Sequence, residues 1–417
     1  MSKPQFKHSA VGPIPLDWNV VQLKDVCTKI GSGITPRGGE KVYREKGIAL
    51  IRSQNVLNNR FSFDGLVYID ESMAKEMENV EVQRQDVLLN ITGDSVARCC
   101  TVPEEVLPAR VNQHVSIIRV NREQVNPVFL RYYLTSPKMQ EYMLSLAQSG
   151  GTRNALTKGL IEDFVAPQPD ISEQEAIADI LSKLEMKIAL NERMNRSLEA
   201  VGAALFRRRF VDFEFPNQEG KPYRSTGGKM VESELGVIPD SWTVGHFSDL
   251  VEVFTGKGLS RDRLTDDGKY PVLGANGELG RTNDFLYDEE LILTGRVGTL
   301  GKVYLINGKV WISDNVLISK PKSANYYHYT YFTLKSFDME ALNRGSTQPL
   351  VTQTDLKNQP IIIPDEKTLA SFEEILSTLY SKVNLNNQQN KTLSTIRALL
   401  LPRLMSGKIR VPLNKEK

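Results

Sequence analysis

Two long stretches of the chain carry hydrophobic residues at alternating spacings of four and three. The first runs from Ile177 to Leu205 and the second from Phe372 to Leu400. This spacing places the residues on one stripe of a helix, and four successive heptads are typical of a coiled coil. Ser172 and Glu175 predict a capping box at the start of the first helix. The two seams consist of Ile177, Leu181, Leu184, Ile188, Asn191, Asn195, Leu198, Gly202 and Leu205, and of Phe372, Leu376, Leu379, Val383, Asn386, Asn390, Leu393, Arg397 and Leu400.

Asparagines interrupt both seams near their midpoints, at Asn191 and at Asn386. Such residues cost stability and are tolerated where they fix the register and the partner of a helix. We therefore predict that the two helices pair antiparallel about a pseudo-two-fold axis, with Asn191 facing Asn386. The alternative is that each seam packs only on its own domain. The residues predicted to set the register are Leu184, Ile188, Asn191, Asn195, Leu379, Val383, Asn386 and Asn390.

The helices belong to a duplication that covers most of the chain. Residues 169–210 return as 364–405 at a constant offset of 195, and Asp179–Phe210 is identical to Glu374–Met405 at 12 of 32 positions. Gly12–Trp18 likewise returns as Gly236–Trp242. Solenoid units are shorter, about 20 to 50 residues, so the repeat indicates duplication of a whole domain together with its helix.

The regions before the helices consist of short hydrophobic runs between turn residues, which predicts strands. The first region contains Ile48–Ile51, Val87–Ile91, Val115–Val120 and a helix from Pro127 to Leu134; the second mirrors it with Leu291–Leu293, Trp311–Ile312 and Tyr331–Phe332. Prolines and glycines in residues 211–234 are typical of a linker. The predicted fold class is α/β (mixed α+β), with two globular domains separated by a pair of long antiparallel coiled-coil helices.

Composition narrows the class of protein without identifying a ligand. The chain is 40% hydrophobic and 24% charged, without a bilayer-length apolar run or a secretory signal at its start. Three cysteines indicate a reducing cytoplasm. The net charge of +2 does not by itself indicate a nucleic-acid-binding protein, but residues 30–60 hold six basic residues against two acidic ones. This local excess suits phosphate contact on one face, or is simply a solvated loop.

No catalytic constellation is found. Asn126–Phe129 resembles the Asn-Pro-Pro-aromatic motif of amino-methyltransferases but lacks the second proline, which favours a helix-entry turn. Gly33–Gly38 has the glycine spacing of a P-loop, but Gly39-Glu40 replaces the required Lys-Ser/Thr. Glu219–Lys221 has a nuclease-like spacing but lies in the linker. The histidines and cysteines have no metal-ligand spacing, so we predict neither a catalytic residue nor a metal site.

Three glycine-containing or polar loops recur in both halves: Ile30–Pro36 with Thr255–Ser260, Thr92–Asp94 with Thr294–Arg296, and Asn112–Val115 with Ser313–Val316. Glycines let backbone amides approach phosphates, and Arg, Lys, Asn and Gln read base edges. For any one such residue, a turn between strands is the favoured explanation, but recurrence of the whole set in both halves favours DNA binding. The predicted DNA-contacting residues are Arg37, Lys41, Arg52, Gln54, Asn55, Arg98, Gln113, His114, Lys257, Arg261, Asn276, Arg281, Arg296, Lys302 and Asn315.

The order of several motifs connects the chain with a known family. The two Gly-x-Ile-Pro-x-x-Trp openings, the segment Pro169–Ala178 and the linker segment Tyr223–Val231 follow one another along nearly the whole length. In this order, the chain resembles the specificity subunit of type I restriction–modification enzymes. The second half departs from the pattern at Pro364–Leu369, which lacks the Glu-Gln pair found at Glu173-Gln174.

This resemblance implies a DNA sequence-recognition subunit that performs no covalent chemistry itself. Two target-recognition domains would each read one half of a split double-stranded DNA target. The conserved helices would set the spacing and dock two modification (methyltransferase) subunits, which hold S-adenosylmethionine. Two restriction (translocase and nuclease) subunits, with ATP and Mg, would complete a cytoplasmic complex that does not involve a membrane, and no cofactor is expected on this chain. The implied segments are recognition domains 1–170 and 235–365, conserved helices 171–210 and 366–410, linker 211–234 and tail 411–417.

Helix length makes the proposed spacing physically reasonable. A seam of about 30 residues at a rise of 1.5 Å is about 45 Å long, which corresponds to about 13 base pairs. Two other functions remain open, a stand-alone DNA-modifying or DNA-cutting enzyme and a coiled-coil scaffold without a nucleic-acid partner. The lack of cofactor motifs argues against the enzyme, and the duplicated loops argue against the scaffold.

Overall fold

The computed structural model describes residues 5–149, 155–298, 300–345 and 348–412, so residues 413–417 of the predicted tail lie outside the description. Contacts divide the chain into two compact units. Unit 1 contains residues 1–190 and 389–417, and unit 2 contains residues 191–388. The division crosses both long helices, so each unit holds one globular domain and parts of both helices. In the described part of the chain, no helix is long and apolar enough to cross a membrane.

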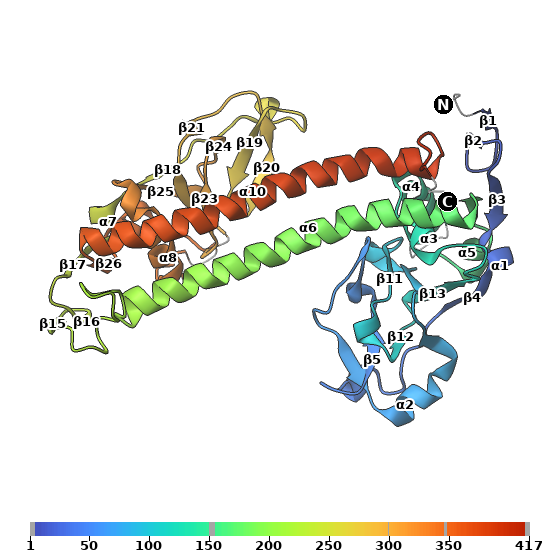
Figure 1. Cartoon of the computed structure of the whole chain (residues 1–417), viewed down its shortest axis with the longest axis horizontal. Coiled ribbons are helices and arrows are strands. Elements are labelled where there is room, and N and C mark those ends of the chain that lie inside the picture. Colours follow the sequence, from blue (N-terminus) through green and yellow to red (C-terminus); the bar gives the residue numbers. More distant parts are fainter. Residues whose placement is uncertain (1–4, 150–154, 299, 346–347, 413–417) are drawn as a thin grey trace. The chain divides into compact units, whose positions relative to one another are not determined.

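Two helices dominate the secondary structure (Figure 1). Helix α6 extends over Ile171–Phe206, 36 residues, and continues into a π-helical turn at Arg207–Val211. Helix α10 extends over Glu366–Met405, 40 residues. The predicted capping box is wrong, because α6 already begins at Ile171 and the carbonyl of Asp170 accepts the amide hydrogen of Glu173 at 2.9 Å.

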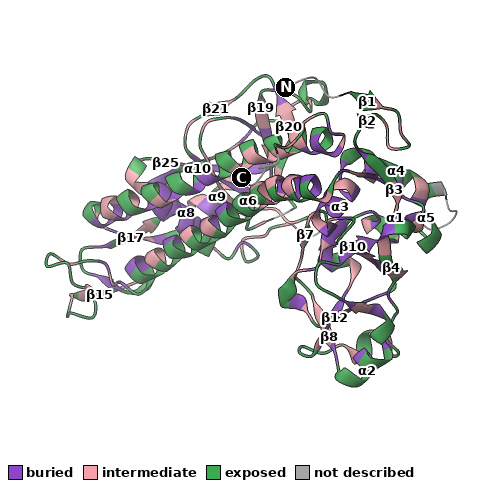
Figure 2. Ribbon diagram, turned by 45° about the vertical axis from the view of Figure 1, so that its right-hand side comes forward, coloured by how far each residue is buried: buried purple, intermediate pink, exposed green. Residues whose placement is uncertain are grey.

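Antiparallel pairing of the two helices is confirmed inside each unit. In unit 1, the Arg397 guanidinium lies 3.4 Å from the Glu185 carboxylate and the Asn390 amide donates to the carbonyl of Ile188. In unit 2, Asn386 pairs with Asn195, and Gly202 lies beside Leu376. Partner numbers fall on α10 as they rise on α6, and buried and exposed residues alternate along both helices (Figure 2).

At one end of each helix, the seam also packs on the helix's own domain, as the alternative prediction stated. Ile177 and Leu181 join Trp18 and Phe129 in a core of unit 1 that also contains residues of α10. Phe372 and Leu376 belong to the large core of unit 2. Each helix therefore begins on its own domain and also packs against the other helix.

Asparagine side chains form a hydrogen-bonded group within the helix pair. The amide of Asn386 donates to Oδ1 of Asn195 at 2.8 Å, and the amide of Asn195 donates to Oδ1 of Asn387 at 2.8 Å. Asn191 is fully buried. The partner found for Asn386 is therefore Asn195, one helical turn from the Asn191 that the sequence predicted.

Replacing Asn386 by leucine alone will lower the free energy of unfolding by about 1–3 kcal/mol, because Oδ1 of the buried Asn195 loses its donor. Replacing Asn195 and Asn386 together by leucine will recover that loss, since both polar groups leave the seam. Urea denaturation of the full chain measures both effects, with the exposed Asn384→Leu as the control. A double variant less stable than the single one would contradict this account.

The globular part of unit 1 has three layers: helices, a first sheet and a second sheet. The first sheet has the order β11-β10-β13-β4 and the second β8-β5-β12-β9. Because neighbouring residues of a strand point to opposite faces, Val87 and Leu89 pack toward helices α3 and α4 while Leu88 packs toward the second sheet. The elements are β1 Phe6–Lys7, β2 Ile14–Pro15, β3 Asn19–Gln22, α1 Leu23–Val26, β4 Cys27–Ser32, β5 Ile48–Ile51, β6 Val56–Leu57, β7 Arg60–Phe61, β8 Val67–Ile69, α2 Glu71–Glu76, β9 Glu81–Val82, β10 Val87–Asn90, β11 Cys99–Thr101, β12 Ala109–Val111, β13 Val115–Val120, α3 Pro127–Leu134, α4 Pro137–Ser149, α5 Lys158–Glu162 and β14 Val165–Gln168.

Unit 2 repeats the strand order of both four-stranded sheets, whereas the β6–β7 pair of unit 1 has no counterpart in the described part of unit 2. Its sheets have the orders β18-β25-β22-β23 and β20-β19-β24-β21, and the parallel pair β5/β12 has its counterpart in β19/β24. Tyr331 and Phe332 lie in α8, the counterpart of α3. The elements are β15 Met230–Ser233, β16 Gly236–Pro239, β17 Thr243–His246, α7 Phe247–Leu250, β18 Val251–Thr255, β19 Tyr270–Gly274, β20 Gly277–Thr282, β21 Tyr287–Asp288, β22 Leu291–Gly295, β23 Val303–Ile306, β24 Lys309–Ile312, β25 Val316–Pro321, α8 Tyr327–Ser336, α9 Gln353–Lys357 and β26 Pro360–Ile363. The duplication predicted from the sequence is therefore a duplication of the fold.

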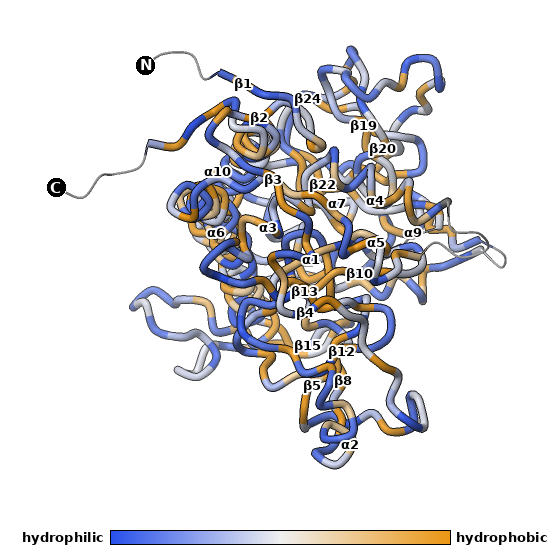
Figure 3. Tube along the Cα trace, turned by 90° about the vertical axis from the view of Figure 1, so that its right-hand side faces the viewer, coloured by the Kyte–Doolittle hydropathy of each residue, from blue (hydrophilic) through white to orange (hydrophobic). Residues whose placement is uncertain are grey.

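The repeated tryptophan motif ties each domain to the helix that follows it. The indole N–H of Trp18 donates to Glu173 at 3.0 Å, and that of Trp242 donates to Asp365 at 3.0 Å. In unit 1, Arg410 after the end of α10 donates to both Glu173 and Asp17. Figure 3 shows the two long helices nearly end-on, with hydrophobic and hydrophilic residues both present in their coils.

Replacing Arg410 by glutamine will lower the free energy of unfolding by about 1–2 kcal/mol at neutral pH, because the buried Glu173 loses its charged partner. The loss is moderate because Arg410 itself is partly exposed to solvent. Hydrogen bonds from Arg410 hold the pKa of Asp17 below its ordinary value of 3.8. The Asp17 contribution is therefore complete above that pH and is lost as the pH falls below it. Urea denaturation at pH 7 and pH 3 will show the difference between wild type and Arg410→Gln narrowing in acid. The exposed Arg403→Gln is the control, and a difference that widens in acid would contradict the assignment.

Candidate nucleic-acid interface

The three predicted loops of unit 1 meet at one end of its sheets. The amide of Gly33 donates to the carbonyl of Val115 and the amide of Ile91 donates to that of His114, both at 3.0 Å. The backbone N–H of Asn112 donates to the carbonyl of Ile51 at 3.0 Å, which places the end of β5 beside these loops. We call residues 33–37, 91–98 and 112–114 loop cluster 1.

Unit 2 contains the same arrangement with matching hydrogen bonds. The backbone N–H of Gly256 donates to the carbonyl of Val316 at 3.3 Å. The backbone N–H groups of Arg296 and Ser313 donate to the carbonyls of Asn315 and Leu273, both at 2.9 Å. We call residues 256–258, 295–298 and 313–315 loop cluster 2. Two different sequences thus build one backbone scaffold, and their side chains differ on it.

Close backbone approach explains one glycine in each cluster. A Cβ atom on Gly33 would lie 1.9 Å from the carbonyl oxygen of Val111, and one on Gly256 would lie 2.2 Å from that of Ile312. Real Cβ atoms do not approach backbone oxygens so closely, so only glycine fits without separating the loops. These glycines position the clusters by letting the loops pack together.

Polar side chains of loop cluster 1 form a chain of hydrogen bonds. The hydroxyl of Thr35 donates to Oε1 of Gln113, and Nε2 of Gln113 lies 2.9 Å from Nε2 of His114. Nδ1 of His114 lies 2.5 Å from the hydroxyl of Thr92. Gln113 and Thr35 are exposed, so the chain of bonds ends at the surface.

Of the residues predicted in the first domain, four lie in loop cluster 1: Arg37, Arg98, Gln113 and His114. Arg52 and Gln54 follow β5, where both donate to the carbonyl of Gly65, at 2.7 and 3.1 Å. Lys41 is exposed in the 3-10 turn Gly39–Val42.

Asn55 is wrong as a DNA-contacting residue, because its side chain is fully buried. Its amide donates to the carbonyls of Ser62 and Asp64, and its Oδ1 accepts from the amide of Arg52. Asn55 therefore holds the loop that presents Arg52 and has no face toward an outside ligand.

In the second domain, Lys257, Arg296 and Asn315 lie in loop cluster 2. Asn276 is exposed at the β19–β20 turn, Arg261 begins the 3-10 turn Arg261–Arg263, and Lys302 is exposed just before β23. Arg281 donates to the carbonyls of Gly268 and Lys269 and to Glu278, so its guanidinium is already used inside the domain. The exposed Asp314, between Ser313 and Asn315, was not among the predicted residues. It aligns with the predicted Gln113 in the repeated turn, and this alignment could have indicated it.

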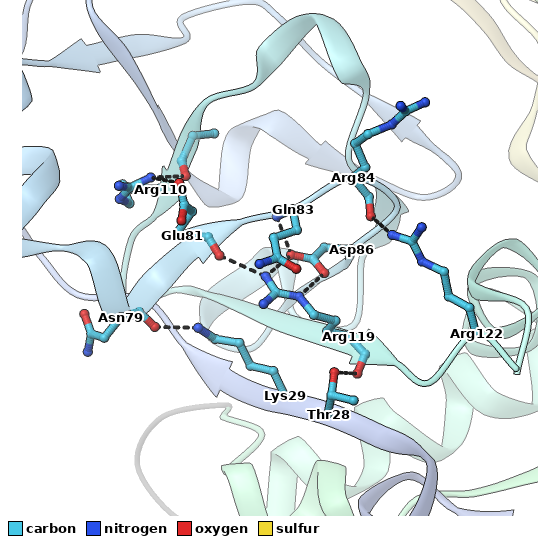
Figure 4. A network of polar contacts seen from close by, with 11 residues as sticks. Thr28, Lys29, Asn79, Glu81, Gln83, Arg84, Asp86, Arg110, Arg119 and Arg122 are labelled. Atoms are coloured by element: carbon cyan, nitrogen blue, oxygen red, sulfur yellow. Dashed lines mark hydrogen bonds and ion pairs between the residues drawn. The ribbon is translucent and has the colours of Figure 1, made fainter. Parts of the chain in front are cut away.

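Basic residues at the two ends of the first domain differ in whether they form ion pairs. Arg37, Lys41 and Arg98 form no ion pair with any residue that the structure describes. At the far end of β13, Arg119 instead forms a two-bond pair with the buried Asp86, at 2.8 and 2.7 Å, and also donates to the carbonyl of Glu81 (Figure 4). Arg119 is therefore neutralised within the protein, whereas Arg37, Lys41 and Arg98 near the loops are available to phosphate.

The rejected catalytic motifs have structural roles. Oδ1 of Asn126 accepts the amide hydrogens of Val128 and Phe129 and caps α3, which confirms the helix-entry turn. Glu219 and Lys221 form an exposed ion pair at 2.9 Å. Among the described residues, no group of three or more His, Cys, Asp or Glu side chains is placed to hold a metal ion.

Comparison with known proteins gives a consistent result. The family described as "Type I restriction modification DNA specificity domain" matches residues 15–200 and 239–395. The type I restriction enzyme MjaIX specificity subunit of Methanocaldococcus jannaschii is 26% identical over 434 residues, covering 98% of this chain and 97% of that protein. The type I restriction enzyme HindI specificity subunit of Haemophilus influenzae is 23% identical over 469 residues, covering 94% of this chain and 100% of that protein. The crystal structure of a type I restriction–modification S subunit from M. genitalium matches with a TM-score of 0.63 at 12% identity, covering 96% and 98% of the two chains, which shows a shared fold.

Proposed function

The chain belongs to the family of type I restriction–modification DNA specificity domains, and from this premise we propose that it selects the DNA sequence on which a type I complex acts. Residues 1–170 and 235–365 form two recognition domains, and each reads one half of a split double-stranded target. The observation that carries this proposal is the pair of matching loop clusters, one in each unit, on a common backbone scaffold.

The helices have two tasks in this proposal. They hold the recognition domains at a fixed spacing, and they dock two methyltransferase subunits. S-adenosylmethionine, ATP and Mg bind to the modification and restriction subunits in the cytoplasm, and this chain contributes recognition without covalent chemistry. The unpaired Arg37, Lys41 and Arg98 contact phosphates and fix the register of the first domain on the duplex.

Methylation mapping tests the proposal directly. The full chain is co-expressed with the methyltransferase subunit of its own system in a host that lacks other methylation, and modified bases are mapped by single-molecule sequencing. We expect a split motif with a fixed unspecified gap, and no methylation or cutting by the purified chain alone. A continuous motif would contradict the two-domain arrangement, and methylation or cleavage by the chain alone would establish a stand-alone enzyme.

A further inference from the structure

The middle residue of one turn differs in chemistry between the two otherwise matching loop clusters. In cluster 1 this residue is Gln113, and the amide of the next residue donates to Oδ1 of Asn112 at 3.1 Å. In cluster 2 it is Asp314, and the amide of the next residue donates to the hydroxyl of Ser313 at 3.2 Å. Both middle residues are exposed. One backbone geometry therefore presents a carboxamide in the first domain and a carboxylate in the second.

The Gln113 amide lies between two polar neighbours, Thr35 and His114. An amide nitrogen can only donate, so Nε2 of His114 accepts its hydrogen at 2.9 Å. Nδ1 of a neutral His114 then carries the proton and donates to the hydroxyl of Thr92. On the other side, the Thr35 hydroxyl donates to Oε1. The amide is thereby held on both sides before any ligand binds.

Each polar atom of Gln113 keeps one unused hydrogen-bonding position. Nε2 has a second N–H, and Oε1 has a second lone pair. A neighbouring donor and acceptor match the N7 acceptor and N6 amino group that adenine presents in the major groove. A guanine presents two acceptors at the same place and cannot satisfy the amide oxygen.

Asp314 has the opposite restriction, because an ionised carboxylate only accepts. Its Oδ1 accepts from Ser313 at 3.3 Å, and Oδ2 faces Gly258, where even an added Cβ would stay 3.6 Å away. A carboxylate in the major groove pairs with the N4 amino group of cytosine.

We propose that Gln113 and Asp314 are specificity-determining residues, Gln113 for an adenine in the first half-site and Asp314 for a cytosine in the second. The inference rests on the proposed function and adds the identity of one base in each half-site. Because the two side chains stand at the same place on the shared scaffold, exchange of their chemistry is the decisive test.

The first experiment maps methylation by the full complex containing Gln113→Ala. We expect one adenine position of the first half-site to accept other bases, with discrimination falling by about 5- to 150-fold, while the second half-site stays unchanged. Gln83→Ala is the matched control, since Gln83 is exposed in the same domain near the neutralised Arg119 end. An unchanged first half-site, or equal weakening for every sequence in binding assays with single-base-substituted oligonucleotides, overturns the proposal.

The second experiment exchanges the chemistry. Gln113→Glu will change the preferred base from adenine to cytosine at that position, and Asp314→Asn will change cytosine to adenine in the second half-site. Melting temperatures equal to wild type verify that both variants fold. Retention of the original bases overturns the proposal even when the wild-type complex methylates a split motif. A wild-type complex without a split motif would instead refute the proposed function itself.

Discussion

Replacing Gly33 by alanine is expected to abolish recognition by the first domain while the second domain keeps its half of the target. The added Cβ would lie 1.9 Å from the carbonyl oxygen of Val111 and 2.4 Å from that of Asn112. Both obstacles are backbone atoms, at the end of β12 and in the turn that carries Gln113, so no side chain can move aside. The end of β4 must separate from this turn, at a cost of about 3 kcal/mol or more. Methylation mapping of the full complex and urea denaturation of the chain measure the two consequences.

Gly31→Ala is the matched control for this prediction. It lies two residues earlier, within β4, where an added Cβ would meet nothing within 4 Å. Gly256→Ala is the counterpart in unit 2, with the Cβ 2.2 Å from the carbonyl oxygen of Ile312, and is expected to affect only the second half-site. Normal methylation by a stably folded Gly33→Ala complex would show that loop cluster 1 is not the recognition surface.

The sequence predicted those parts of the fold that depend on local periodicity. The strands Ile48–Ile51 and Val115–Val120 and the helix Pro127–Leu134 agree with the structure residue for residue, because their hydrophobic runs end in turn residues. The antiparallel helix pair followed from the heptads. The heptads did not predict Asn195 as the hydrogen-bond partner of Asn386. A shift of one helical turn preserves the heptad pattern, so only the packing of the two helices determines the partner.

Candidate site residues were harder to predict than the loops that carry them. Duplication identified the loops but misaligned one pair. Asn90 pairs with Val115 and Gly295 with Val316, so Gly295 corresponds to Asn90 and not to Gly93. Charge and residue type cannot distinguish a free side chain from one already bonded, and so Asn55 and Arg281 were included although the protein itself uses their polar groups. Asp314 was not among the predicted residues, all of which were Arg, Lys, Asn, Gln or His, although a carboxylate can accept a hydrogen bond from a base.

Lengthening both long helices by one heptad is expected to move the methylated motif to a longer gap. Seven residues are added to α6 by repeating 192–198 and seven to α10 by repeating 383–389, around the Asn195–Asn386 pair. Seven residues add about 10.5 Å to a helix and keep the hydrophobic seam on nearly the same face. This length corresponds to about three base pairs, so we expect both half-sites to be retained and the gap to grow by about three.

Two controls separate helix length from helix pairing in this experiment. Adding seven residues to α6 alone leaves its partner too short, which breaks the register of the seam and is expected to lower stability and methylation. Adding two residues to both helices turns the seam by about 200°, away from the partner, and is expected to do the same. The heptad insertion alone preserves pairing and changes length. Because pairing is then intact, an unchanged gap in a stable, active complex would mean that the helices do not determine the distance between the half-sites.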